Sequence, residues 1–107
     1  MNALDHNTGN DIDVNTAWHH IGRQTLMFTG AQNRVYGRDF VQFTVQGGGK
    51  AKHNVIVQLG TNDLYNVEIG RVARRTFEWK TAYVTRDVPA ENLPRAIMEG
   101  YAAVYGD

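Results

Sequence analysis

Residues 54–69 read NVIVQLGTNDLYNVEI and contain two runs of alternating apolar and polar side chains separated by a turn. The apolar residues on one side of the two runs are Val55, Val57 and Leu59, followed by Tyr65, Val67 and Ile69. A period of two is typical of a strand that buries one face. The segment between them, Gly60-Thr61-Asn62-Asp63, has the composition of a turn. This segment therefore predicts an antiparallel β-hairpin of two half-buried strands.

Further strands are predicted on both sides of this hairpin. Residues 41–46 alternate Val, Phe and Val with Gln, Thr and Gln, and residues 77–83 place aromatic side chains at alternate positions. Residues 24–29 have a continuous apolar centre, which predicts a strand buried on both sides and closed by Gly30. A loop is expected at residues 31–34, a short strand at 35–36 and a bulge at Gly70. The succession of strands predicts an antiparallel meander.

Two amphipathic helices are predicted at the ends of this sheet. Asp13 is a good N-cap for a helix over residues 13–21, where Val14, Ala17, Trp18 and Ile21 form one apolar stripe that Gly22 ends. A second helix begins near Pro94, and Gly100 is expected to weaken it by about 1 kcal/mol relative to Ala. The predicted fold is α+β: an antiparallel sheet of four to five strands with an N-terminal and a C-terminal helix packed on one face.

The composition indicates one domain and sets limits on its chemistry. The chain has 107 residues, of which 42% are hydrophobic, and it has no cysteine. Residues 1–12 are small, polar and acidic, so a flexible tail is expected there and a single α+β domain over residues 13–107. Neither a leader peptide nor an apolar run long enough to span a bilayer is expected. A soluble intracellular protein is therefore the expectation.

No motif in the chain predicts catalysis, a cofactor or a metal. Gly47-Gly48-Gly49-Lys50 lacks the Ser or Thr and the helix of a phosphate-binding loop, so a hairpin loop is expected there. His19 and His20 point about 100° apart on a helix and cannot ligate one metal from the same face. The chain has neither Ser nor Cys for nucleophilic catalysis. We expect a protein that is not an enzyme and holds neither a metal nor a cofactor.

The basic residues are concentrated in the strand-rich part of the chain. The formal net charge is zero, but ten of the eleven Lys and Arg residues lie between residues 23 and 86, whereas the ends of the chain are acidic. Such a cluster either forms a solvated face or attracts phosphates and acidic protein surfaces. The residues that we predict to contact a partner are Arg71, Arg74, Arg75, Lys80, Lys50 and Lys52.

The aromatic residues beside these cations allow two interpretations. The alternation of residues 77–83 places Phe77, Trp79 and Tyr83 on one strand face, which is typical of a core stripe. If the helices covered the opposite face, the rings would instead be exposed beside the cations. Such mixtures of rings and cations bind single-stranded nucleic acids.

Two short blocks resemble a family of small bacteriophage proteins. The first is Phe28-Thr29-Gly30-Ala31-Gln32-Asn33, in which Gln32 occupies a position where that family usually has Lys. The second is Asp63-Leu64-Tyr65-Asn66-Val67-Glu68-Ile69, and residues 101–105 match the end of the family more loosely. The family has no assigned activity. The resemblance therefore implies a phage origin and a small α+β fold, and it transfers no site residue.

The first function hypothesis is a non-enzymatic phage accessory protein that binds a host or phage macromolecule in the host cytoplasm. The partner is expected to be a protein, and inhibition of a bacterial defence system is one concrete version. Single-stranded nucleic-acid binding is the first alternative, through Arg71, Arg74, Arg75 and Lys80. The second alternative is a virion or assembly component that forms homo-oligomers through an edge strand. No membrane partner is expected.

Overall fold

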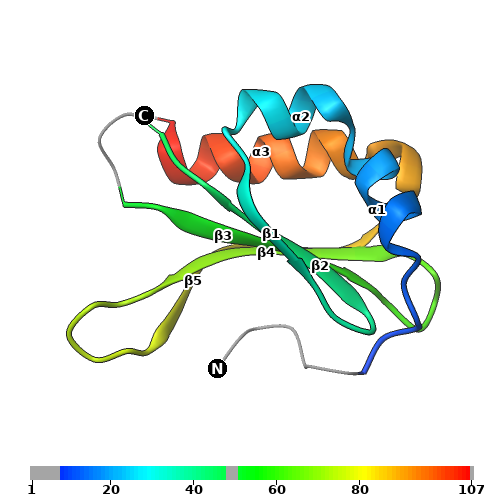
Figure 1. The fold of residues 1–107 in the computed structure, drawn as a ribbon, viewed down its shortest axis with the longest axis horizontal. Helices are drawn as coiled ribbons and strands as arrows, with labels where there is room; N and C mark the ends of the chain where they lie inside the picture. Colours follow the sequence, from blue (N-terminus) through cyan, green and yellow to red (C-terminus); the bar gives the residue numbers. More distant parts are fainter. Residues whose placement is uncertain (1–7, 48–50, 107) are drawn as a thin grey trace.

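The computed structural model describes residues 8–47 and 51–106, and its centre is one antiparallel sheet of five strands (Figure 1). The strands follow one another in space in chain order, each paired with the next. They are β1 (Gln32–Tyr36), β2 (Phe40–Val45), β3 (His53–Leu59), β4 (Tyr65–Val72) and β5 (Trp79–Val88). The predicted meander is therefore confirmed, and its edge strands are β1 and β5.

The helices all lie on one face of this sheet (Figure 1). They are α1 (Val14–Ile21), α2 (Arg23–Phe28) and α3 (Leu93–Tyr105), and the short 3-10 helix η1 (Ala90–Asn92) leads into α3. The Asp13 side chain accepts a hydrogen bond from the Thr16 amide, which confirms it as the N-cap of α1. This hydrogen bond holds the pKa of the Asp13 carboxyl below its ordinary value. The predicted α+β class, with terminal helices packed on one sheet face, is confirmed.

The hydrophobic core lies between the helices and one face of the three central strands. Val55, Val57, Tyr65, Val67 and Ile69 are buried here as predicted, Leu59 is partly buried, and the helical stripes close over them. The largest fully buried apolar side chains are Phe43, Ile21, Ile69, Leu93 and Ile97. The opposite face of the sheet carries no helix (Figure 1).

The predicted strand over residues 24–29 is wrong, because Arg23–Phe28 forms α2. A strand buried on both sides would hide Met27 and Phe28, yet these side chains are 71% and 68% exposed. Within α2, the buried residues are Thr25 and Leu26. They are neighbours in sequence, and a helix can bury two neighbouring residues on the same side. The Ala31 amide donates to the Leu26 carbonyl (2.9 Å) and turns the chain into β1.

β1 is longer than predicted, and the segment before α1 is hydrogen-bonded to the sheet. β1 includes residues 32–34, which were expected to form a loop. The Asn10 amide donates to the Leu59 carbonyl (3.0 Å), and the Ile12 amide donates to the Arg38 carbonyl (2.8 Å). Residues 1–7 of the predicted tail, and residues 48–50 of the predicted glycine loop, lie outside the described residues.

Candidate functional site

The site is the hairpin that joins β4 to β5, which extends beyond the helical layer at one end of the sheet (Figure 1). Val72 and Trp79 form the last strand pair before the loop. The Ala73 amide donates to the Glu78 carbonyl, and the Phe77 amide donates to the Ala73 carbonyl, each at 2.8 Å. These two bonds fix the backbone of the loop, so its side chains project from a defined frame.

Four of the predicted contact residues lie together on this hairpin. Arg71 and Lys80 are directly opposite each other on the two strands, and Arg74 and Arg75 are exposed in the loop. Within residues 8–47 and 51–106, the ion pairs are Arg38–Asp11 and Arg95–Glu99, and neither involves the hairpin. Glu78 is the single carboxylate in the hairpin segment 71–80. The hairpin therefore carries a net positive charge of three.

Phe77 follows the turn at residues 74–76, and its backbone amide is held against Ala73 on the opposite side of the loop. Its side chain is 81% exposed, and its φ of 56° is in the left-handed region. A bulky residue is rarely found in that region unless the surroundings require it. The ring therefore faces solvent next to Arg74 and Arg75.

The prediction that Phe77, Trp79 and Tyr83 share one strand face is wrong. Phe77 precedes β5, and the pairing of β4 with β5 shifts register between Ile69 and Gly70. This irregularity places Tyr83 on the helical face, where its ring lies against Gly100, and Trp79 on the other face. The three rings therefore have three different surroundings, which strict alternation cannot describe.

A buried carboxylate anchors the root of the hairpin. Glu68 in β4 is fully buried on the helix-free side of the sheet. Its Oε2 accepts hydrogen bonds from the Trp79 indole Nε1 (2.7 Å) and from the Thr81 hydroxyl. Buried carboxylates require such donors, because an unpaired charge in the interior is strongly unfavourable. The alternation of residues 65–69 places Glu68 on the face opposite the core, and this network accompanies its burial there.

Of the other two predicted contact residues, Lys50 and Lys52, the structure describes Lys52. Lys52 is exposed directly before β3, and the pairing of Asn54 with Gly70 places it at the same end of the sheet as the hairpin. Lys50 lies outside the described residues. Arg34 lies over the Trp18 ring, 5.3 Å from its centroid, on the helical side. The sequence signal for the site was thus the density of cations around residues 71–80.

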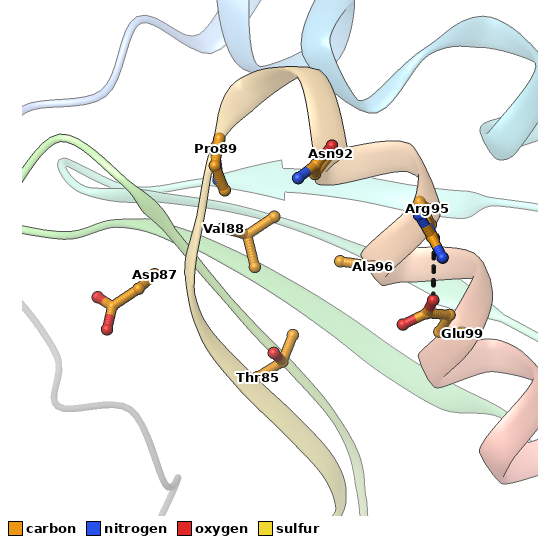
Figure 2. A pocket seen from close by; sticks show the side chains of 8 residues that line it. All are labelled: Thr85, Asp87, Val88, Pro89, Asn92, Arg95, Ala96 and Glu99. Atoms are coloured by element: carbon orange, nitrogen blue, oxygen red, sulfur yellow. Dashed lines mark hydrogen bonds and ion pairs between the residues drawn. The ribbon is translucent and has the colours of Figure 1, made fainter.

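Two shallow hollows lie at the opposite end of the sheet. A pocket of about 290 Å³ lies between the end of β5 and the start of α3, where Arg95 pairs with Glu99 across 3.1 Å (Figure 2). A second hollow, of about 410 Å³, is lined by His19, His20 and Glu91 among others. His20 Nδ1 lies 2.8 Å from the Tyr65 hydroxyl. In the described part of the chain, no three His, Cys, Asp or Glu side chains are grouped so that they could hold a metal ion.

The fold and the candidate site together define a small antiparallel α+β protein with a cationic hairpin whose loop carries an exposed ring. Among the described residues, no helix combines the length and the apolar character needed to cross a membrane. Comparison with protein-family models, with curated proteins and with solved structures finds no match for this chain.

Proposed function

We propose that this protein acts by binding a macromolecular partner through the β4–β5 hairpin, without catalysing a reaction. The observation that supports this proposal is the group of four cations around the exposed Phe77 ring. None of the four is neutralised by an ion pair within the described residues. A charged segment of this kind attracts an anionic surface over a distance of about a Debye length, ~8 Å at physiological salt.

The conformation of Phe77 supports a role in binding. The left-handed backbone destabilises an ordinary residue by roughly 1–2 kcal/mol, and an exposed ring recovers little of this through burial. Strained residues of this type cluster at sites of function. A ring that contributes little to folding has its use in a contact with another molecule.

The resemblance to small phage proteins suggests the setting of this contact. It supports a host or phage macromolecule as the partner, in the cytoplasm of an infected cell, and an inhibitor of a bacterial defence system remains one version of the proposal. A stoichiometric binding protein fits a small domain that carries four cations on one hairpin.

A second candidate function is self-association through β1. All five residues of this edge strand are exposed, including Val35 and Tyr36, and an uncovered edge is a template for pairing with another strand. Such pairing corresponds to the second alternative from the sequence, a virion or assembly component that forms homo-oligomers through an edge strand. Light scattering across a range of concentrations tests it, because edge pairing requires a mass that rises with concentration.

Affinity capture from bacterial lysate tests the hairpin proposal. The double variant Arg74→Gln/Arg75→Gln removes two charges from the hairpin loop. The matched control is Arg23→Gln/Arg95→Gln, which removes two exposed charges from α2 and α3. We expect one partner, protein or nucleic acid, to be retained by the wild type and the control and lost from the hairpin variant. Equal retention by all three proteins would contradict the proposal.

A further inference from the structure

We infer that the partner of the β4–β5 hairpin is single-stranded nucleic acid, with phosphates bound by the four cations and an unpaired base stacked on Phe77. This inference rests on the proposed function and names the chemistry of its partner. Arginine and lysine neutralise phosphates, and aromatic rings stack on bases of any sequence. The hairpin presents both kinds of group on one short segment.

The spacing of the cations allows them to act on one strand of phosphates. Arg71 and Lys80 face each other across paired strands, which lie about 4.8 Å apart. Arg74 is three residues further along the chain, at most about 10 Å at the rise of a strand. This length is close to the Debye length, about 8–10 Å at moderate salt. The four charges are therefore close enough to act together on the same segment of a phosphate backbone.

The small apolar area at the tip favours a nucleic acid over an acidic protein. Specific protein interfaces bury about 800 Å² on each partner and have an apolar centre. The tip offers the Phe77 ring and the half-exposed Val72 side chain, which is too little for such a centre. By contrast, stacking of one nucleic-acid base requires only one face of the Phe77 ring. The positive charge supplies the rest of the affinity without a large contact area.

The exposed ring also favours a single strand over a duplex. In a duplex each base is stacked between its neighbours, so a ring can contact its face only after the base is pulled out, which costs a few kcal/mol. A base in a single strand has a free face and stacks at no such cost. The Phe77 side chain is 81% exposed, which leaves room for this base.

Fluorescence anisotropy with a labelled oligothymidylate tests the inference on the full chain. We expect binding at low salt that weakens as salt rises, with a slope of log K against log salt near −2.8 if four phosphates are neutralised (about −0.7 for each). Arg74→Gln/Arg75→Gln is expected to reduce this slope by about half, whereas Arg23→Gln/Arg95→Gln leaves it unchanged.

The ring is tested separately from the charges. Phe77→Gly removes the ring from an exposed site and accommodates the left-handed backbone, so the fold is retained. We expect affinity to fall roughly 5- to 150-fold, the range for one stacked base. Phe77→Trp keeps a ring and is expected to bind at least as tightly as the wild type. Circular dichroism of each variant confirms that any loss is not due to unfolding.

Three outcomes would overturn the inference. They are no binding of oligothymidylate at low salt, unchanged affinity in Phe77→Gly, and tighter binding of the corresponding duplex. Polyglutamate serves as a protein-like polyanion in the same assay. If polyglutamate binds through the hairpin cations and oligothymidylate does not, the nucleic-acid inference fails and the proposed macromolecule-binding function stands. If the hairpin charges affect neither probe and lysate capture is equally insensitive to them, both fail.

Discussion

At the scale of single residues, Phe77 stands apart from the other left-handed positions of the described chain. The non-glycine residues with positive φ are Asn33, Asp63, Asp87 and Phe77, at 53°, 62°, 59° and 56°. Asn and Asp tolerate this region because their short polar side chains can form hydrogen bonds with nearby backbone groups. Phe has no such compensation. This difference is the observation behind the binding role that we propose for the ring.

The left-handed backbone at Phe77 predicts different stabilities for two substitutions of this residue. Phe77→Ala and Phe77→Gly both remove the ring, but only glycine adopts a φ of 56° without strain. We expect the glycine variant to be the more stable of the two by about 1 kcal/mol in free energy of unfolding. Urea denaturation measures the difference. An alanine variant as stable as the glycine variant would show that the loop is not left-handed at this residue.

At the scale of secondary-structure elements, the sequence was most informative where one face of an element is buried. The alternation in β2, β3 and β4 and the stripes in α1 and α3 predicted these elements because burial on one side produces a visible period. Residues 24–29 have no such period, because a short continuous apolar run is compatible with either a helix or a strand. The packing partners in the folded protein decide between the two. The register shift in β5 left no trace in the alternation of its residues.

The sequence likewise predicted only part of the candidate site. The density of cations identified Arg71, Arg74, Arg75 and Lys80, and the structure groups these four on one hairpin. The exposure of Phe77 could not be predicted, because it depends on where β5 begins and on one backbone angle. The burial of Glu68 depends on donors that arrive from β5, which no local pattern records.

Helix α3 supports a prediction that reverses the expectation from helix propensity. A methyl group added at Gly100 would lie 2.6 Å from the Tyr83 ring and 2.7 Å from Ile69 Cδ1, and Ile69 is fully buried. Overpacking of this kind costs roughly 1–3 kcal/mol, more than the ~1 kcal/mol that alanine gains in a helix. We expect Gly100→Ala to lower the free energy of unfolding by about 1 kcal/mol.

Urea denaturation measures the effect, and an exposed position in the same helix provides the control. Ala102→Gly is expected to destabilise by about 1 kcal/mol through helix propensity, because the Ala102 side chain is exposed. If Gly100→Ala stabilised the protein, the close contact between α3 and the β4–β5 pair would be refuted.

The end of α3 also predicts a dependence on alkaline pH. The Tyr105 hydroxyl lies 2.9 Å from the Ala51 carbonyl and 3.2 Å from the Val45 carbonyl, and His53 Nδ1 is 3.0 Å away. Burial raises the pKa of the Tyr105 hydroxyl above its ordinary value of 10.0. The stabilisation from the neutral hydroxyl is therefore complete below pH 10.0 and is lost as pH rises through the higher folded value.

Tyr105→Phe tests this assignment. We expect it to lower the free energy of unfolding by about 0.5–1.5 kcal/mol at neutral pH, through the lost hydrogen bond. Above pH 10.0 the stability of the variant should fall less steeply than that of the wild type. Urea titrations across this range, with Tyr36→Phe on the exposed edge strand as the control, provide the measurement. Parallel curves for the wild type and Tyr105→Phe would contradict the pKa direction.

At the scale of the whole molecule, charge is separated along the sheet. The hairpin and the turn between β3 and β4 lie at opposite ends of β4. The carboxylates of Asp63 and Asp87 lie at the turn end, because Tyr65 pairs with Val88 there. Asp13 and Glu91 lie at the start of α1 and in η1, at the same end (Figure 1). The formal net charge of zero therefore conceals a positive and a negative end.

This separation predicts retention on a cation exchanger near the isoelectric point of 6.9. A protein of zero net charge with evenly mixed charges would pass through the column unretained. This protein is expected to be retained, because its hairpin can contact the resin while its acidic end points away. We expect Arg74→Gln/Arg75→Gln to elute at lower salt than Arg23→Gln/Arg95→Gln, although both variants have the same formal charge. Identical elution of the two variants would show that the charge is not segregated.

The two ends lie on a molecule whose longest dimension is 34 Å. A polyanion within about a Debye length of such a molecule would attract its positive end and repel its negative end, and so exert a torque on it. If the hairpin binds a polyanion as we propose, this torque turns the hairpin toward the partner before contact. Orientation before collision raises the fraction of encounters that are productive.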